Sequence, residues 1–522
     1  MRIEDIEDAS VLKSVAIHLN RENARLHGQM MALEARLSLL EGVDPDKAQL
    51  RIAHLEELLR KREQALFGAS TEQRTSPGGS GTSGAKKDRK GHGPTEQLGL
   101  PIEEKVRVLP VEDRKCDACG GELSEWVGEF EESEEITIIE REPIIVRNKR
   151  QKYRCKCNGC VKTAPPPPKL IEGGRYSIEF AVEVAADKYL FHAPLERQAR
   201  KFIGEGLIVL SQTLWDQVRA LSQAALPTYQ AIRNEIIQEE VIHADETPWH
   251  LLDKRRSGGK KWYVWEIVSQ SLAYFEIHDS RSQEAAAHLL AGFQGTVMAD
   301  GYTVYQDLAR TLLQGRLDAP DATGGFEVAN CWAHGRRGFV ECEVNFPTEC
   351  KQILDLIAEL YMVEREVPFG LDDAEILAAR ASLRAEKSAA IIDRIKKWCG
   401  ATPALPQSGL GKAIAYLTNQ WVGLTRFLQN PRIALDNNLG ERTLRGSVLG
   451  RKNFYGSKSR RGTETAAIMY TLFESAKLSG VNPKAYVAEL ARRAIENPGA
   501  VLLPEDFKRL CAESAAPVGP DG

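Results

Sequence analysis

Leucine recurs at every seventh position near the start of the chain, at Leu12, Leu19, Leu26, Leu33 and Leu40. This heptad spacing is typical of a coiled coil, because it keeps an apolar seam on one side of a helix. Asn23 lies in the same seam, where a buried amide fixes the register of two parallel helices. We therefore predict a coiled coil over residues 1–67 that forms a homodimer or a higher assembly. The alternative is an amphipathic helix that packs against its own chain.

The apolar periodicity stops between residues 68 and 98. This segment is rich in glycine, serine and threonine, and four basic residues lie between Lys86 and Lys90. Such a composition buries too little apolar surface to offset the entropy of ordering, so it predicts a flexible basic linker. Four prolines at 165–168 predict an extended spacer at the end of the next unit, residues 99–170.

Helical periodicity returns over residues 171–235. Apolar residues recur there at intervals of three and four, and a turn at Gly204–Gly206 separates two of the predicted helices. One interpretation is a DNA-binding helix-turn-helix, in which Ser211 caps the second helix and three polar side chains face DNA: Gln212, Gln217 and Arg219. The alternative is a helical pair that only packs against the rest of the chain.

After residue 235 the pattern becomes that of strands. Apolar runs predict strands at 241–252, 262–268, 272–278, 296–300 and 326–332, with a short helix at 283–293 between the third and fourth. This order is that of a ribonuclease H-like α/β domain, and the chain as a whole is expected to be a multidomain α/β protein. The predicted core has two parts separated by a helical insertion and followed by a C-terminal segment: 236–340, 341–424, 425–482 and 483–522.

Two aspartates lie in or at the end of predicted strands that are otherwise mostly apolar. Asp245 lies inside the apolar strand 241–249, and Asp300 ends the strand that begins at Val297. A buried carboxylate is costly unless a cation or a donor compensates it, so two aspartates on neighbouring strands favour a metal site. Each aspartate alone is also explained as a turn or capping residue, since Asp followed by Gly is a turn signal.

A third carboxylate, Glu441, follows a predicted helix start. Asp436 or Asn437 is expected to cap that helix, which places Glu441 in its early turns beside Arg442 and Arg445. The simplest interpretation of such a group is a solvated face of ion pairs. The alternative is that the arginines hold DNA phosphates beside metal-binding carboxylates.

Charge is segregated along the chain. The net charge is −4, yet residues 442–463 contain seven basic residues and no acidic one. We therefore predict a local DNA-binding surface rather than a protein that is basic throughout. Its predicted contacts are Arg442, Arg445, Arg451, Lys452, Arg336 and Arg337. No apolar run approaches the length of a membrane-spanning helix, and the acidic start is unlike a signal peptide, so a cytoplasmic location is expected.

Five of the ten cysteines lie between Cys116 and Cys160. Two CxxC pairs predict a structural zinc site that closes a small β unit, with the ligands Cys116, Cys119, Cys157 and Cys160. Cys155 is a competing ligand, and unliganded thiols are the alternative. Cys331 and His334 resemble half of a metal site, but no second pair accompanies them, so a packing or DNA-proximal role is preferred.

Several motifs together carry a family resemblance. They are the segments 243–249 (HADETPW), 299–302 (ADGY), 331–337 (CWAHGRR), 436–442 (DNNLGER) and 450–453 (GRKN). In these and along nearly its whole length the chain resembles transposases of the insertion sequence sixty-six family. The resemblance implies an acidic triad of Asp245, Asp300 and Glu441, with a helical insertion between the second and third members. It also implies small accessory proteins encoded beside the transposase.

The expected function is DNA transposition. Two Mg²⁺ or Mn²⁺ ions held by the triad would support cleavage at transposon ends and strand transfer into target DNA. A bacterial, nucleoid-associated enzyme is expected. The sequence lacks a phosphate-binding loop for ATP, so ATP-driven transposition is not indicated. Two alternatives remain open: a catalytically inactive DNA-binding or assembly relic, and a junction-type nuclease that never joins strands.

Overall fold

The computed structural model describes Glu57 and residues 142–154, 161–252, 261–318, 325–367 and 373–515. Contacts divide the chain into two units, residues 1–67 with 143–522 and residues 68–142, and the elements below belong to the first. The predicted linker, the four predicted zinc ligands and all of the predicted coiled coil except Glu57 lie outside the described residues. A short antiparallel hairpin, β1 (Lys152–Arg154) with β2 (Val161–Thr163), precedes the main body.

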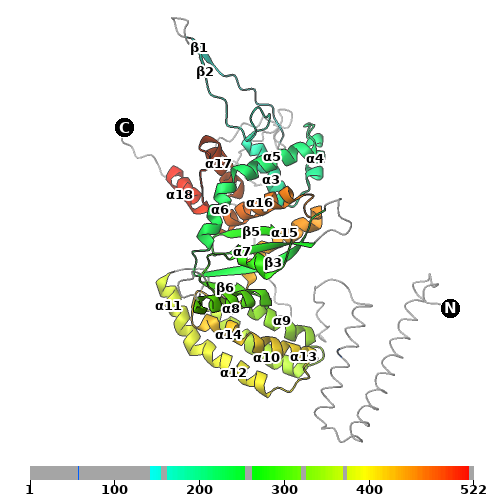
Figure 1. Ribbon diagram of the computed structural model, residues 1–522, viewed down its shortest axis with the longest axis vertical. Helices are drawn as coiled ribbons and strands as arrows, with labels where there is room; N and C mark the ends of the chain where they lie inside the picture. Colours follow the sequence, from blue (N-terminus) through cyan, green and yellow to red (C-terminus); the bar gives the residue numbers. More distant parts are fainter. Residues whose placement is uncertain are drawn as a thin grey trace, which may run out of the picture. The chain divides into compact units, whose positions relative to one another are not determined.

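A five-stranded sheet forms the centre of a mixed α/β fold (Figure 1). Its strands follow the spatial order β5-β4-β3-β6-β7. β3, β4 and β5 are antiparallel neighbours, whereas β6 and β7 run parallel to β3. The five predicted strands are all present, as β3 (Val241–His250), β4 (Lys261–Val268), β5 (Ala273–His278), β6 (Thr296–Ala299) and β7 (Glu327–Asn330).

Helices cover both faces of the sheet. Asp245 pairs with Glu266 and Glu246 pairs with Trp265 across β3 and β4, so adjacent carboxylates point to opposite faces. Thr443 of α15 donates to Glu266 on one face, and Tyr305 of α8 donates to Glu246 on the other. The helices concerned are α7 (Gln283–Leu289) and α8 (Thr303–Asp318) on the second face, and α15 (Asn438–Phe454) on the first. The sequence analysis did not predict α8.

Both edges of the sheet are covered. Along β5, the backbone amides of Phe275 and Ala273 donate to Thr471 Oγ1 at 2.9 Å and Ser475 Oγ at 3.0 Å, both on α16 (Arg460–Leu478). Along β7, Arg426 Nε donates to the Val328 carbonyl at 3.0 Å. These contacts satisfy backbone groups that an open edge would present to other chains. The sheet is thereby confined between two helical parts of the chain (Figure 1).

The first helical part lies on the β5 side (Figure 1). Its helices share a core with the sheet and are α3 (Ile178–Tyr189), α4 (Leu195–Gly204), α5 (Ser211–Ala224), α6 (Leu226–Ile236), α16, α17 (Pro483–Glu496) and α18 (Pro504–Ala515). The predicted helical pattern is confirmed, but two details of the helix-turn-helix interpretation are wrong. Leu210, not Ser211, is the N-cap of α5, and it makes no side-chain cap bond. Gln217 is buried, since it lies on the apolar side of α5, and so does not face DNA.

The second helical part follows β7 and has its own core. It consists of α9 (Trp332–Cys342), α10 (Pro347–Glu364), α11 (Ala374–Leu383), a π-helical turn (Arg384–Ser388), α12 (Ala389–Ala401), α13 (Gly409–Asn419), α14 (Trp421–Thr425) and a 3₁₀ turn (Arg426–Leu428). Trp332 is fully buried here and donates to the Leu424 carbonyl. Within the described ranges, no helix is long and apolar enough to cross a membrane.

Candidate active site

The sheet brings the two predicted aspartates together. β3 and β6 are parallel, and their register pairs Ile242 with Val297 and His243 with Met298. Continuing this register by two residues places Asp300, which directly follows β6, beside Asp245. Residues in register point to the same face, so both carboxylates belong to the face that α15 covers. The loop after β6 holds Asp300 in place, because the Tyr302 amide donates to its Oδ1 at 2.8 Å.

The neighbouring carboxylates affect the pKa of Asp245. Burial raises its pKa to about 8, with further contributions from the negative charges of Glu246, Asp300 and Glu441. The Glu246 amide opposes this shift by donating to Asp245 Oδ1 at 2.8 Å. A buried carboxylate whose pKa is raised partly by neighbouring carboxylates lies in a site that a divalent cation would stabilise, and the hard oxygen ligands there suit Mg²⁺.

The start of α15 positions Glu441 against β3. Asn437 is the N-cap residue, but its side chain does not cap the helix as the sequence analysis expected. It is fully buried, donates through Nδ2 to the Ala244 carbonyl at 3.0 Å, and contacts His243 Nδ1 through Oδ1 at 2.9 Å. These bonds attach the start of α15 to the part of β3 that directly precedes Asp245. Asp436 instead stabilises the turn, since its Oδ1 accepts from the Asn438 amide.

Glu266 is a further acid that the sequence analysis missed. It is fully buried, lies opposite Asp245 in the β3–β4 register, and both its oxygens accept from Thr443 Oγ1 at 3.0 Å. Burial, together with the charge of Asp245, raises its pKa well above the ordinary value. A protonated Glu266 can therefore link β4 to α15 without adding charge. The signal was present, because Glu266 is a lone acid inside the apolar run 262–268.

Glu246 is adjacent to Asp245 but has a different environment. Arg281 Nε donates to its Oε1 at 3.0 Å, and the Tyr305 hydroxyl donates to its Oε2 at 2.8 Å. The guanidinium of Arg281 compensates the buried charge. Glu246 is thus neutralised within the protein, whereas Asp245 lies among carboxylates. This difference supports the choice of Asp245 over Glu246, which the sequence made only by resemblance.

His334 lies beside Glu441, with 3.7 Å between its Nδ1 and Glu441 Oε1. Cys331, His334 and Glu441 place one ligand atom each within 4.8 Å of the others, so the predicted half-site does gain a third residue. Burial raises the pKa of the Cys331 thiol to about 12, and its sulfur accepts from the Asn437 amide. A thiol that stays protonated is a poor metal ligand. This favours the predicted packing role of Cys331 and places His334 next to the candidate active site.

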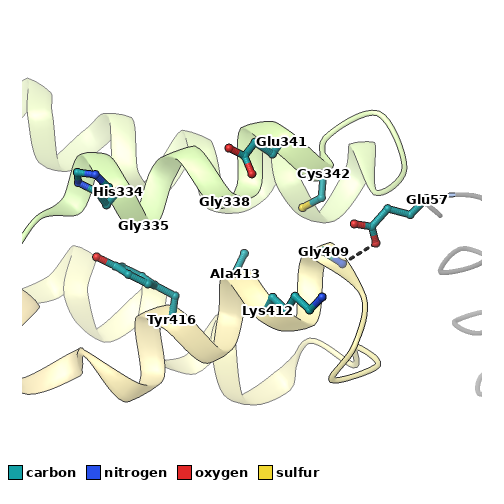
Figure 2. Close-up of a pocket in the computed structure, with 10 residues that line it drawn as sticks. All are labelled: Glu57, His334, Gly335, Gly338, Glu341, Cys342, Gly409, Lys412, Ala413 and Tyr416. Atoms are coloured by element: carbon teal, nitrogen blue, oxygen red, sulfur yellow. Dashed lines mark hydrogen bonds between the residues drawn. The ribbon is translucent and has the colours of Figure 1, made fainter. Parts of the chain in front are cut away.

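A pocket of about 230 Å³ lies between α9 and α13. Figure 2 shows His334 and Tyr416 on the two facing helices at one end of it. The Tyr416 hydroxyl is buried and has no hydrogen-bond partner among the described residues. Its ring lies against Gly301, where a Cβ atom would come within 2.5 Å of the ring. Gly301 is therefore required by the close approach of the insertion to the loop that carries Asp300.

The residues predicted to contact DNA differ in solvent exposure. Arg442, Arg445 and Lys452 are exposed along α15, and Arg336 and Arg337 are exposed on α9. Arg451 is half-buried, and its guanidinium donates to Thr247 Oγ1 at 3.2 Å and to the Pro248 carbonyl. It therefore contributes to the attachment of α15 to β3, in contrast to its exposed neighbours.

The carboxylate cluster predicts a stability gain in the metal-free protein when Asp245 is replaced by asparagine. The pKa of Asp245 is raised from 3.8 to about 8 in the fold, so folding favours the protonated carboxyl. That contribution is complete below the ordinary pKa and is lost as the pH rises through about 8. Since one pKa unit corresponds to about 1.4 kcal/mol, Asp245→Asn should stabilise the metal-free protein by a few kcal/mol at pH 8, and by less at pH 5.

Thermal unfolding in a chelator at these two pH values measures this effect. Asp307→Asn is the matched control, because Asp307 forms an exposed ion pair with Arg310 away from the cluster. A gain for Asp245→Asn that does not grow with pH would show that Asp245 is an ordinary ionised carboxylate in the fold.

Comparisons with known proteins match most of the chain to one family. Residues 173–465 match the family model described as "Transposase IS66 family". The matched range includes all three candidate carboxylates. Residues 113–158 match the model described as "zinc-finger binding domain of transposase IS66". The second match contains Cys116, Cys119, Cys155 and Cys157 and ends before Cys160.

Three relatives from Sinorhizobium fredii (strain NBRC 101917 / NGR234) align with most of the chain, and all three are named as uncharacterized proteins. y4jD is 30% identical over 77% of this chain and 80% of its own length. y4hP is 28% identical over 78% of this chain and 76% of its own length. y4qI is 26% identical over 96% of this chain and 97% of its own length.

Proposed function

The chain belongs to the IS66 family of transposases, and we propose that it cleaves DNA at the ends of a mobile element and joins the freed 3′-hydroxyl groups to target DNA. The observation that carries the proposal is the convergence of three carboxylates. Asp245 lies on β3, and Asp300 directly follows the adjacent parallel strand β6, where the β3–β6 register continued by two residues places it beside Asp245. The charges of Asp300 and Glu441 both act on Asp245. Clustered carboxylates of this kind serve phosphodiester chemistry in two-metal sites.

We infer that the sheet and its covering helices form a ribonuclease H-like core. The strand order β5-β4-β3-β6-β7, with three antiparallel strands followed by two parallel ones, supports this assignment. The helical part between β7 and α15 is then the insertion that separates the second and third carboxylates.

Asp245, Asp300 and Glu441 are the proposed ligands of Mg²⁺ or Mn²⁺. When bound, two such ions activate the attacking oxygen and stabilise the leaving oxygen of the phosphodiester. The donor set fits, because it consists of carboxylates whose mutual repulsion a divalent cation relieves. Asn437 and Thr443 act as positioning residues, since their bonds to β3 and β4 fix the first turns of α15, where Glu441 lies.

The remaining parts of the chain have proposed supporting roles. The zinc-finger match supports a structural zinc ion, for which we propose Cys116, Cys119, Cys157 and Cys160 as ligands. The heptad region is proposed to form a homodimer or higher assembly on DNA. Small accessory proteins are further proposed partners.

A cutting and joining assay tests the proposed function. The full chain is incubated with labelled DNA that carries the element's ends and with a target plasmid, in Mg²⁺, in Mn²⁺ or in a chelator. We expect metal-dependent joined product. DNA that is bound but uncut, even with accessory proteins supplied, would support the relic instead. Cut ends that never become attached to a second duplex would support the junction nuclease.

The exposed arginines of α15 give a separate prediction. Arg442 and Arg445 project from the helix that carries Glu441. Replacing both by alanine should weaken DNA binding and reduce the slope of log affinity against log salt by roughly two, about one per lost phosphate contact. Fluorescence anisotropy over a salt series measures this slope, with Arg509→Ala on α18 as the control. An unchanged slope would place the phosphates elsewhere.

A further inference from the structure

A cluster of two histidines and a glutamate lies at the edge of the sheet, apart from the three proposed catalytic carboxylates. Glu276 and His278 are on β5, and His288 is on α7. Glu276 Oε2 lies 2.6 Å from His278 Nε2 and 3.0 Å from His288 Nδ1. One ligand atom from each residue lies within 4.8 Å of the other two. We propose that these three residues form a separate binding site for a first-row transition-metal ion such as Zn²⁺.

The donor set matches this class of metal. Two imidazole nitrogens and one carboxylate oxygen are ligands that Zn²⁺ and its neighbours accept, whereas Mg²⁺ and Ca²⁺ prefer oxygen alone. The three residues leave room for a fourth ligand, because the His288 side chain is two-thirds exposed. Oε2 of Glu276 faces the ring nitrogens of both histidines, so the three ligand atoms converge on one point.

The surroundings hold the ligands in place. The Tyr274 hydroxyl donates to Glu276 Oε1 at 2.6 Å, which leaves Oε2 directed at both histidines. Outer hydrogen bonds of this type orient metal ligands and increase their affinity. Arg233 of α6 donates to the carbonyls of His288 and Leu289, so the end of α7 that carries the third ligand is also fixed.

The cluster is distinct from the proposed active site. Glu276 pairs with Trp265 on β4, and Trp265 pairs with Glu246 on β3. The cluster therefore shares the face of Glu246, opposite to that of Asp245, and a whole strand separates it from β3. A metal ion there would join the edge strand β5 to α7, independently of whether the chain is an active transposase.

Metal titration of the full chain tests the proposal. The metal-free protein is titrated with Co²⁺ in excess Mg²⁺, which occupies carboxylate sites. Cobalt held by cysteines gives an intense thiolate charge-transfer band, whereas cobalt held by nitrogen and oxygen gives only weak visible bands. We expect both signals in the native chain, and loss of the weak bands with about one equivalent of bound Co²⁺ in His288→Ala.

Two further variants test the outer hydrogen bond and control for the loss of a histidine. Tyr274→Phe should retain the weak bands but lower the Co²⁺ affinity roughly tenfold. His250→Ala, which removes an exposed histidine of β3, should bind as the native chain does. Circular dichroism shows whether each variant is folded. If His288→Ala is not folded, Glu276→Gln, which changes another proposed ligand, replaces it. If His288→Ala binds as much Co²⁺ as the native chain, and as much Zn²⁺, the proposal is overturned. The three residues would then form only a hydrogen-bonded cluster.

Discussion

Replacing Glu441 by glutamine is expected to reduce DNA cleavage by about 10²–10³-fold or more, because the change removes one charge from the proposed metal site while keeping the side chain's shape. DNA binding should stay within a few-fold of the native value, since the exposed arginines of α15 remain. Cleavage is measured on end-labelled DNA in Mg²⁺, and binding by mobility shift in Ca²⁺.

Asp436→Asn is the matched control for Glu441→Gln. Asp436 belongs to the same sequence motif, but its Oδ1 accepts from the Asn438 amide and so stabilises the turn before α15. It should therefore retain most of the cleavage activity. Equal losses in the two variants, or cleavage by Glu441→Gln at the native rate, would remove Glu441 from the catalytic set.

Replacing Arg384 by methionine is expected to destabilise the protein by about 3–5 kcal/mol, because it leaves a buried charge network without its centre. The Arg384 side chain is fully buried and donates to both oxygens of Glu364 at 2.7 Å. It also donates to three carbonyls in the segment that leads from the insertion to α15, those of Phe427, Asn430 and Ile433.

Denaturant unfolding followed by circular dichroism measures this loss. Arg394→Met serves as the control, because Arg394 forms an exposed ion pair with Glu359 and its removal should cost much less stability than the loss of Arg384. The double variant Arg384→Met with Glu364→Leu should recover part of the loss, since no unpaired carboxylate remains. A single-variant cost as small as that of the control would show that the network is not structural.

Period-two and apolar patterns were sufficient to predict the strands. β3 to β7 appear where apolar runs lie between turn residues, because such runs can bury both faces of a strand. Helix α8 was not predicted, because Asp300-Gly301 just before it is a turn signal. The structure shows that Gly301 serves a close approach to Tyr416 instead. That contact spans more than a hundred residues of sequence, so no local pattern reveals it.

The carboxylates of the candidate site could be proposed from the sequence, but the residues around them could not. A charge inside an apolar strand indicated Asp245 or Glu246, and family resemblance was needed to choose between them. The same logic applied to Glu266 would have found it too. Family resemblance was needed to choose Glu441. The roles of Asn437 and His334 depend on which strand α15 and α9 meet, and this follows from tertiary packing. Of the two expected caps, Asp436 accepts from the Asn438 amide, whereas the side chain of Asn437 bonds to β3 instead.

Asp300→Cys offers the most direct test of the central claim that these carboxylates hold catalytic metal ions. A cysteine thiolate is a soft ligand that binds Mn²⁺ better than the hard Mg²⁺ ion. The account predicts that this variant cuts and joins DNA in Mn²⁺ but not in Mg²⁺, while Asp300→Ala is inactive in both. Native-level activity of Asp300→Cys in Mg²⁺, or inactivity of the folded variant in both metals, would contradict it.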